Sequence, residues 1–226
     1  MGKIIDPALD GHLTRLMAAR DAAAARHVRG LVTALLALLV GLALPNQAMP
    51  SASDGAPVFL AARKPIAAPA GFAGLCQSHR WLCARSGAGA TVPGDALGRA
   101  AAINRAVNHG VRQISDRRQY GRDDVWALPT RRGGDCEDLA MLKKQKLVAA
   151  GMPAERLLLA TALDRRRQPH AVLILRTARG DLVLDNLTDR ILPWQATGYS
   201  FIKMQNPDRP SRWDAVLAGG IFDRRG

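Results

Sequence analysis

Two segments in the middle of the chain repeat apolar residues at the three- to four-residue spacing of an amphipathic helix. In residues 96–112 these positions are Leu97, Ala101, Ile103, Val107 and Val111. In residues 135–150 they are Leu139, Met141, Leu142 and Leu147. Asp135 is a suitable N-cap for the second helix and Gly151 a suitable terminator. The pattern therefore predicts two helices, the second directly after the helix-breaking pair Gly133-Gly134.

Beyond residue 155 the pattern changes to short apolar and β-branched runs that are typical of strands. The predicted strands cover residues 156–163, 171–176, 181–184, 191–194 and 199–204. The pair Gly180-Asp181 predicts a hairpin turn between two of them. Helices followed by consecutive strands predict an α+β fold in which helices pack on an antiparallel sheet.

The first fifty residues differ from the rest. Residues 31–44 are uncharged and follow Arg20, Arg26 and Arg29. This run is shorter than the roughly 20 residues that span a membrane as a helix. A basic flank, a short apolar run and then small residues are typical of a secretory signal. We predict a signal peptide over residues 1–48, with a long n-region that a start at Met17 would shorten; a retained anchor and a buried helix are the alternatives.

The remaining chain divides by composition. Residues 49–74 are rich in Ala, Pro and Gly without a period, which predicts a linker or an irregular N-terminal arm. Residues 75–226 are then expected to form the folded domain, and the length of 226 residues suits one domain with appendages.

The net charge is +13, from 32 Lys and Arg against 19 Asp and Glu. Residues 1–48 hold five basic and three acidic residues, so their removal leaves +11. The surplus arginines are scattered, and no aromatic residues alternate with them as a nucleic-acid stacking surface requires. We expect an arginine-rich solvated surface and no nucleic-acid partner.

The chain has three cysteines. Cys76 and Cys83 are separated by six residues, and an exported protein can join them as a disulfide. A metal site with His79 is the alternative, but it lacks the paired spacing of zinc sites. Cys136 remains, at the first turn of the second predicted helix. A helix N-terminus favours the thiolate, so Cys136 is a candidate nucleophile; an inert buried thiol is the alternative.

His170 precedes one predicted strand and Asp185 ends the next. The two residues pair across a hairpin if residue numbers sum to about 355, which centres the turn near Thr177-Ala178. A cysteine on a helix with a histidine and an aspartate on neighbouring strands would supply a nucleophile, a base and an orienting group.

Three stretches carry a resemblance: residues 134–140 (GDCEDLA), 170–173 (HAVL) and 183–186 (VLDN). Together they resemble the bacterial transglutaminase-like cysteine proteinases, the periplasmic group that includes the LapG-type proteases of biofilm adhesins. Tyr120-Gly121, Asp124, Trp126, Trp194 and the Cys76–Cys83 spacing are also similar. Two features depart from the family: Leu139 stands where Tyr is usual, and no acidic residue follows Pro129.

The resemblance implies a papain-like, transglutaminase-like core, with Cys136 as nucleophile, His170 as general base and Asp185 as its orienting partner. It also implies calcium held by Asp135, Glu137 and Asp138. A bound Ca²⁺ would offset the field of these carboxylates, which opposes thiolate formation. Helix capping by the same acids is the alternative.

The resemblance further implies a periplasmic protein that cleaves a surface adhesin between small residues, under the control of an inner-membrane cyclic-di-GMP receptor. Two alternatives use the same domain. One is a transglutaminase-type acyltransferase, which employs the same three residues, and the other is a non-catalytic periplasmic binding module.

Overall fold

The computed structural model describes residues 56–86 and 93–223. The predicted signal segment lies outside these ranges. Seven antiparallel strands form one sheet in the order β1-β7-β6-β2-β3-β4-β5. Their bounds are Pro65–Ile66, Leu157–Leu163, Pro169–Thr177, Gly180–Leu184, Leu192–Pro193, Ser200–Gln205 and Trp213–Ala218 for β1 to β7. The helices are α2 (Leu75–Ser78), α3 (Ala96–Gly110), α4 (Asp116–Tyr120) and α5 (Cys136–Ala149). The α+β prediction is confirmed.

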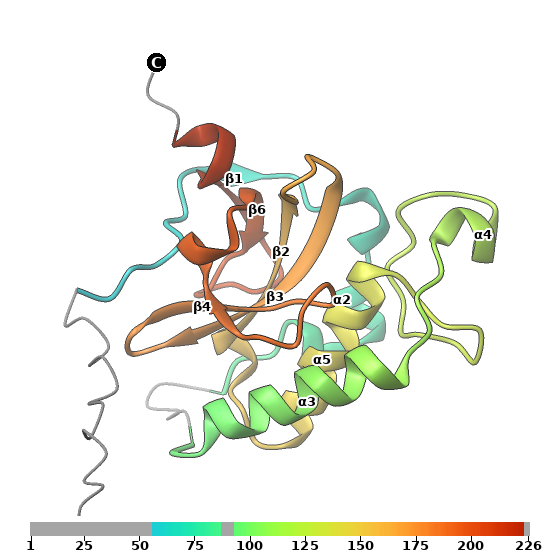
Figure 1. Cartoon of the computed structure of the whole chain (residues 1–226), viewed down its shortest axis with the longest axis horizontal. Coiled ribbons are helices and arrows are strands. Elements are labelled where there is room, and N and C mark those ends of the chain that lie inside the picture. Colours follow the sequence, from blue (N-terminus) through green and yellow to red (C-terminus); the bar gives the residue numbers. More distant parts are fainter. Residues whose placement is uncertain (1–55, 87–92, 224–226) are drawn as a thin grey trace, which may run out of the picture. The chain divides into compact units, whose positions relative to one another are not determined.

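The two faces of the sheet are covered differently because successive side chains on a strand point to opposite faces. Leu157 and Leu159 of β2 pack with α3 and α5, which cover one face (Figure 1). Leu158 and Ala160 belong to a second cluster with Phe201 of β6. The central strands are therefore buried on both faces. Within the described ranges, no helix combines the length and apolar character needed to cross a membrane.

The N-terminal arm crosses the second face of the sheet. Leu60 is buried, and its amide donates to the Asp181 carboxylate at 2.8 Å. Further along, the Arg63 amide donates to the Ala215 carbonyl of β7 at 2.8 Å, and β1 then pairs with β7. The segment predicted as a linker or irregular arm thus contributes to both the core and the sheet.

A disulfide joins Cys76 and Cys83, whose Cα atoms are 5.5 Å apart, as the sequence predicted. It links α2 to the short 3₁₀ helix Arg80–Leu82, and Leu82 in that helix is fully buried. The bond therefore holds the two short helices together, and Leu82 packs with residues of α5 and the sheet.

Helix α5 is enclosed on nearly all sides, since it packs against both α3 and the sheet. Lys143 and Lys144, which a simple amphipathic pattern places on the outer face, are as buried as Leu139 and Leu147. The Lys144 ammonium donates to the Gln205 side-chain oxygen at 2.8 Å. Burial lowers the pKa of Lys144 to about 7.

Replacing Lys144 with methionine is expected to stabilise the fold at neutral pH. The folded-state pKa lies below the ordinary 10.5, so the unfolded chain binds more protons between pH 7 and 10.5, and stability rises with pH in that window. We expect Lys144→Met to raise the free energy of unfolding at pH 6 by about 2 kcal/mol and to flatten that rise. Denaturant unfolding across pH 6–10 measures both, with exposed Lys146→Met as control. A less stable variant that retains the full pH slope would contradict the prediction.

Candidate active site

The loop before α5 depends on the two glycines that the sequence marks as a helix break. A Cβ on Gly133, which has φ +121°, would lie 2.0 Å from the Arg112 carbonyl oxygen. A Cβ on Gly134 would lie 2.7 Å from the Asp138 Cβ. The missing side chains therefore let the chain pass close to residue 112 and let the Asp138 side chain fold back over the helix start.

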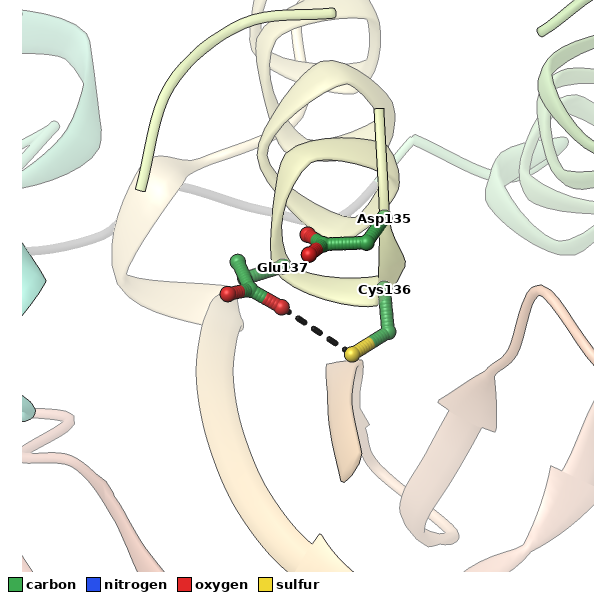
Figure 2. Close-up of side chains that lie close together, drawn as sticks. All are labelled: Asp135, Cys136 and Glu137. Carbon is green, nitrogen blue, oxygen red and sulfur yellow. Dashed lines mark hydrogen bonds between the residues drawn. The ribbon is translucent and has the colours of Figure 1, made fainter. Parts of the chain in front are cut away.

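The Cys136 thiol lies at the first residue of α5. It is half-buried and donates to a Glu137 carboxylate oxygen at 3.0 Å (Figure 2). Burial and the negative charge of Glu137 raise the pKa of this thiol well above its usual value. The backbone N–H of Ala171, the residue after His170, acts in the opposite direction and favours the thiolate. The helix N-terminus alone therefore does not activate the thiol, contrary to the simplest expectation from sequence.

His170 and Asp185 form a buried pair. The His170 Nε2 and an Asp185 carboxylate oxygen are 2.9 Å apart. Asp185 also accepts from the Tyr199 hydroxyl at 2.5 Å and from the Leu187 amide at 3.0 Å. Burial alone would raise the pKa of Asp185, but the hydrogen bond and charge of His170, with the other two donors, lower it. Asp185 is thus held as a carboxylate against the imidazole.

The hairpin register differs from the expected one. Leu173 pairs with Leu184 and Thr177 with Gly180, so paired residue numbers sum to 357 rather than 355. The turn lies at Ala178-Arg179, and Gly180 already begins β4. The shift of two residues preserves the side-chain alternation, so His170 and Asp185 remain on the same face as diagonal neighbours.

The loop that carries Asp185 is attached to the C-terminal half of α3. The Asn108 side-chain amide donates to the Asp185 carbonyl at 2.9 Å, the Thr188 carbonyl at 3.1 Å and the Asp189 carboxylate at 3.0 Å. Asn104, one turn earlier, donates to the Thr188 and Asp189 carbonyls. The sequence did not predict this contact, because the helical period identifies the apolar positions of the helix and gives no role to Asn104 and Asn108.

Three aspartates converge beside the cysteine. Asp116, Asp135 and Asp138 each offer a carboxylate oxygen, and these oxygens lie within 4.8 Å of one another. One oxygen of each carboxylate accepts a backbone N–H: Val125 donates to Asp116, Asp116 to Asp135 and Ala127 to Asp138. The other oxygen of each is buried and has no partner among the described residues.

Burial and the neighbouring negative charges make the three aspartates harder to ionise than free carboxyl groups. Burial, together with the charge of Glu137, raises the pKa of Asp135 to about 7. Burial likewise raises the pKa of Asp138 to about 7, and burial with the charge of Asp135 raises that of Asp116. Unpartnered buried carboxylate oxygens are what a hard cation such as Ca²⁺ binds.

The cation set expected from sequence, Asp135, Glu137 and Asp138, is divided in the structure. Glu137 groups with Asp135 and the Cys136 sulfur, whereas Asp138 groups with Asp135 and Asp116. Asp116 is 19 residues before Asp135, and its only sequence signal is an acidic residue at the start of a short helix. Trp126, one of the residues that carry the family resemblance, is buried edge-to-face against Phe72 and Trp213 and belongs to the core.

A cysteine at a helix start and a buried His–Asp pair on neighbouring strands of an antiparallel sheet define the transglutaminase-like class of cysteine peptidases. The family model described as bacterial transglutaminase-like cysteine proteinase, BTLCP, matches residues 62–220. The chain belongs to this family, and it is accordingly a cysteine peptidase that acts on protein.

Among solved structures, the chain is similar to calcium-bound LapG of Legionella pneumophila, with 27% identity over 55% of this chain and 71% of that one and a TM-score of 0.46. The EGTA-treated form of the same protein matches at 25% identity over 63% and 84% of the two chains, with a TM-score of 0.44. No curated protein matches the chain.

Replacing Asn108 with alanine is expected to impair catalysis as well as stability. The change removes the donor to the Asp185 carbonyl, so the loop that carries Asp185 can shift, and small displacements of catalytic groups are costly. We expect kcat/KM to fall about 10- to 100-fold, and stability by about 1–2 kcal/mol. Asn104→Ala is the matched control, since it loosens the same loop without contacting Asp185. Equal loss of activity in both variants would contradict a specific role for Asn108.

Proposed function

We propose that this protein is an exported, calcium-dependent endopeptidase in which Cys136 is the nucleophile, His170 the general base and Asp185 the orienting residue. The observation that carries this proposal is the buried His170–Asp185 pair, together with the Ala171 amide beside the Cys136 sulfur. Asp185 engages Nε2 of the imidazole, which leaves Nδ1 available for the thiol proton.

In the proposed reaction, His170 takes the proton of Cys136 and the sulfur attacks the scissile carbonyl carbon. The tetrahedral intermediate collapses when the C–N bond breaks and the imidazolium returns its proton to the leaving amine. Water, deprotonated by the same imidazole, then hydrolyses the thioester and restores the thiol. Asp185 stabilises the imidazolium and fixes the ring, while the Tyr199 hydroxyl fixes Asp185.

Calcium is part of the proposal because the residues present suit it. Asp116, Asp135 and Asp138 would hold the ion through their unpartnered oxygens. Glu137 lies next to this site, close to both Asp135 and the Cys136 sulfur. When bound, Ca²⁺ would supply positive charge that makes the Cys136 thiolate less costly and fixes the loop before α5. The family resemblance supports the same conclusion.

Export is supported by the signal pattern of residues 1–48 and by the Cys76–Cys83 disulfide, since disulfides persist in oxidising compartments such as the periplasm. For the substrate, we propose a bacterial surface protein such as a biofilm adhesin, with activity controlled by an inner-membrane cyclic-di-GMP receptor. Resemblance to the LapG-type branch supports both, and an adhesin gene beside this gene would strengthen the assignment.

The test of the proposed function is cleavage by the purified mature protein in calcium-containing buffer. New N-termini in a mixture of proteome-derived peptides, read by mass spectrometry, report cleavage of any sequence that the enzyme accepts. Cleavage that persists unchanged in Cys136→Ala would refute the assignment of the nucleophile.

A further inference from the structure

A pocket of about 500 Å³ opens beside Asp185, the residue that orients His170. Asp185 and Tyr199 line one side of it. The turn between β2 and β3 contributes Arg165 and Arg166, and the loop between β4 and β5 contributes Arg190. The pocket is therefore built from three separate segments that meet at the partners of the catalytic imidazole.

The position of this pocket identifies which half of a substrate it can contact. His170 must return its proton to the leaving amine, so the peptide on the C-terminal side of the scissile bond has to lie against the imidazole. Asp185 and Tyr199 touch that imidazole or its partner and also line the pocket. Cys136 and His170 are not among the residues that line the pocket, and Asp185 contacts the Nε2 edge of the imidazole. A side chain of the leaving half that enters the pocket therefore has to extend past the imidazole to its Asp185 side.

The charges around the pocket favour an anion. Among the described residues, Arg165, Arg166 and Arg190 form no salt bridge with any carboxylate. The Arg165 guanidinium is oriented by the Thr197 carbonyl, to which it donates at 2.7 Å. All three arginines are exposed, so their side chains are accessible to a ligand.

Among the described residues, neither acid of the lining forms a salt bridge with these arginines, and the three guanidinium groups outnumber the two carboxylates. Asp164 accepts the amides of Arg166 and Gln168 at 2.8 Å, which closes the turn. Asp185 is occupied by His170, Tyr199 and Leu187. The guanidinium groups are therefore left for a ligand, and an arginine pairs well with a carboxylate through two parallel hydrogen bonds.

Building on the peptidase function proposed above, we propose that this pocket receives an aspartate or glutamate side chain from the leaving half of the substrate, within three residues of the scissile bond. The substrate class is then a protein segment that is acidic on the C-terminal side of the cleavage site. This selectivity is separate from the chemistry at Cys136, because the arginines do not contact the reacting groups.

The test uses tryptic peptides of a bacterial proteome, cleaved by the mature protein in calcium. We compare Asp and Glu with their neutral isosteres Asn and Gln at the three positions after the cut. Wild type is expected to enrich the acids about 5-fold or more, and the double variant Arg166→Gln, Arg190→Gln to bring the ratio close to unity. Arg179→Gln is the control, because Arg179 is an exposed arginine in the hairpin turn at the opposite end of β3.

The outcomes separate the two proposals. Cleavage without acid enrichment, or enrichment that the double variant keeps, overturns the pocket assignment and leaves the peptidase function standing. Loss of enrichment in Arg179→Gln as well would show a general charge effect and also overturns the assignment. Absence of any cleavage by wild type overturns the peptidase function and this inference with it.

Discussion

Cys136→Ala is expected to abolish peptide-bond cleavage while leaving the protein folded. Removal of a nucleophile from a catalytic triad costs about 10⁴- to 10⁶-fold in kcat, because the remaining groups cannot form the covalent intermediate. Cleavage of peptides by wild type and variant, followed by mass spectrometry, measures the loss. Alkylation of wild type should reproduce it, since Cys136 is the free thiol of the described chain.

The stability of this variant is its control. Cys136 is half-buried and its thiol donates to the Glu137 carboxylate. Removing the thiol therefore leaves only a small cavity at the edge of the core, so thermal unfolding should change by only a few degrees. If the variant retains measurable turnover, the nucleophile is a residue other than Cys136. If the variant fails to fold, the activity of the alkylated wild type decides the assignment.

Removing calcium is expected to cost both activity and stability. Without a cation, Asp116, Asp135 and Asp138 hold like charges close together in a buried setting, and such repulsion is destabilising. Asp116→Asn should weaken calcium binding about 10-fold or more, because it deletes a charged ligand distant in sequence from the other two. Calorimetric titration with calcium measures the affinity. Asp123→Asn in the same loop is the control, since Asp123 is exposed and pairs with Arg117.

The pH dependence of the metal-free protein follows from the same cluster. The folded-state pKa values of Asp135 and Asp138 are about 7, above the ordinary 3.8, so the folded state binds more protons between these values. Stability should therefore fall as pH rises from 4 to 7, by about 2–4 kcal/mol after allowance for solvent screening. Thermal unfolding of metal-free and calcium-loaded protein across this range tests the prediction. A metal-free protein whose stability is flat or rises would contradict it.

The sequence predicted those parts of the fold that have strong periodicity. Helices α3 and α5 begin and end within two residues of the predicted bounds, and β2 to β6 were all expected. Two strands, the two-residue β1 and the six-residue β7, were missed. Strand β1 lies in a segment rich in Ala, Pro and Gly, which shows no strand pattern. It forms a strand because it pairs with β7, a contact distant in sequence. Strand β7 itself follows a polar stretch that resembles a terminal loop.

Other features depend on tertiary contacts that a linear pattern does not contain. Lys143 and Lys144 are buried because α5 is surrounded on nearly all sides, so its sequence lacks a clear outer face. Asp116 joins the carboxylate cluster through the path of the loop before α5. The His170–Asp185 contact was predicted in spite of a register wrong by two residues, because an even shift keeps side chains on the same face.

The N-terminal arm determines where a shortened version of this protein can begin. A boundary at residue 75, where the composition changes, would delete Leu60, which fills the second core cluster and whose amide donates to the Asp181 carboxylate. Burial of one leucine is worth about 1.5–3 kcal/mol, a large share of the stability of a small domain. Recombinant enzyme for the assays above should therefore retain the chain from at least residue 56, and any affinity tag belongs at the C-terminus or before that residue.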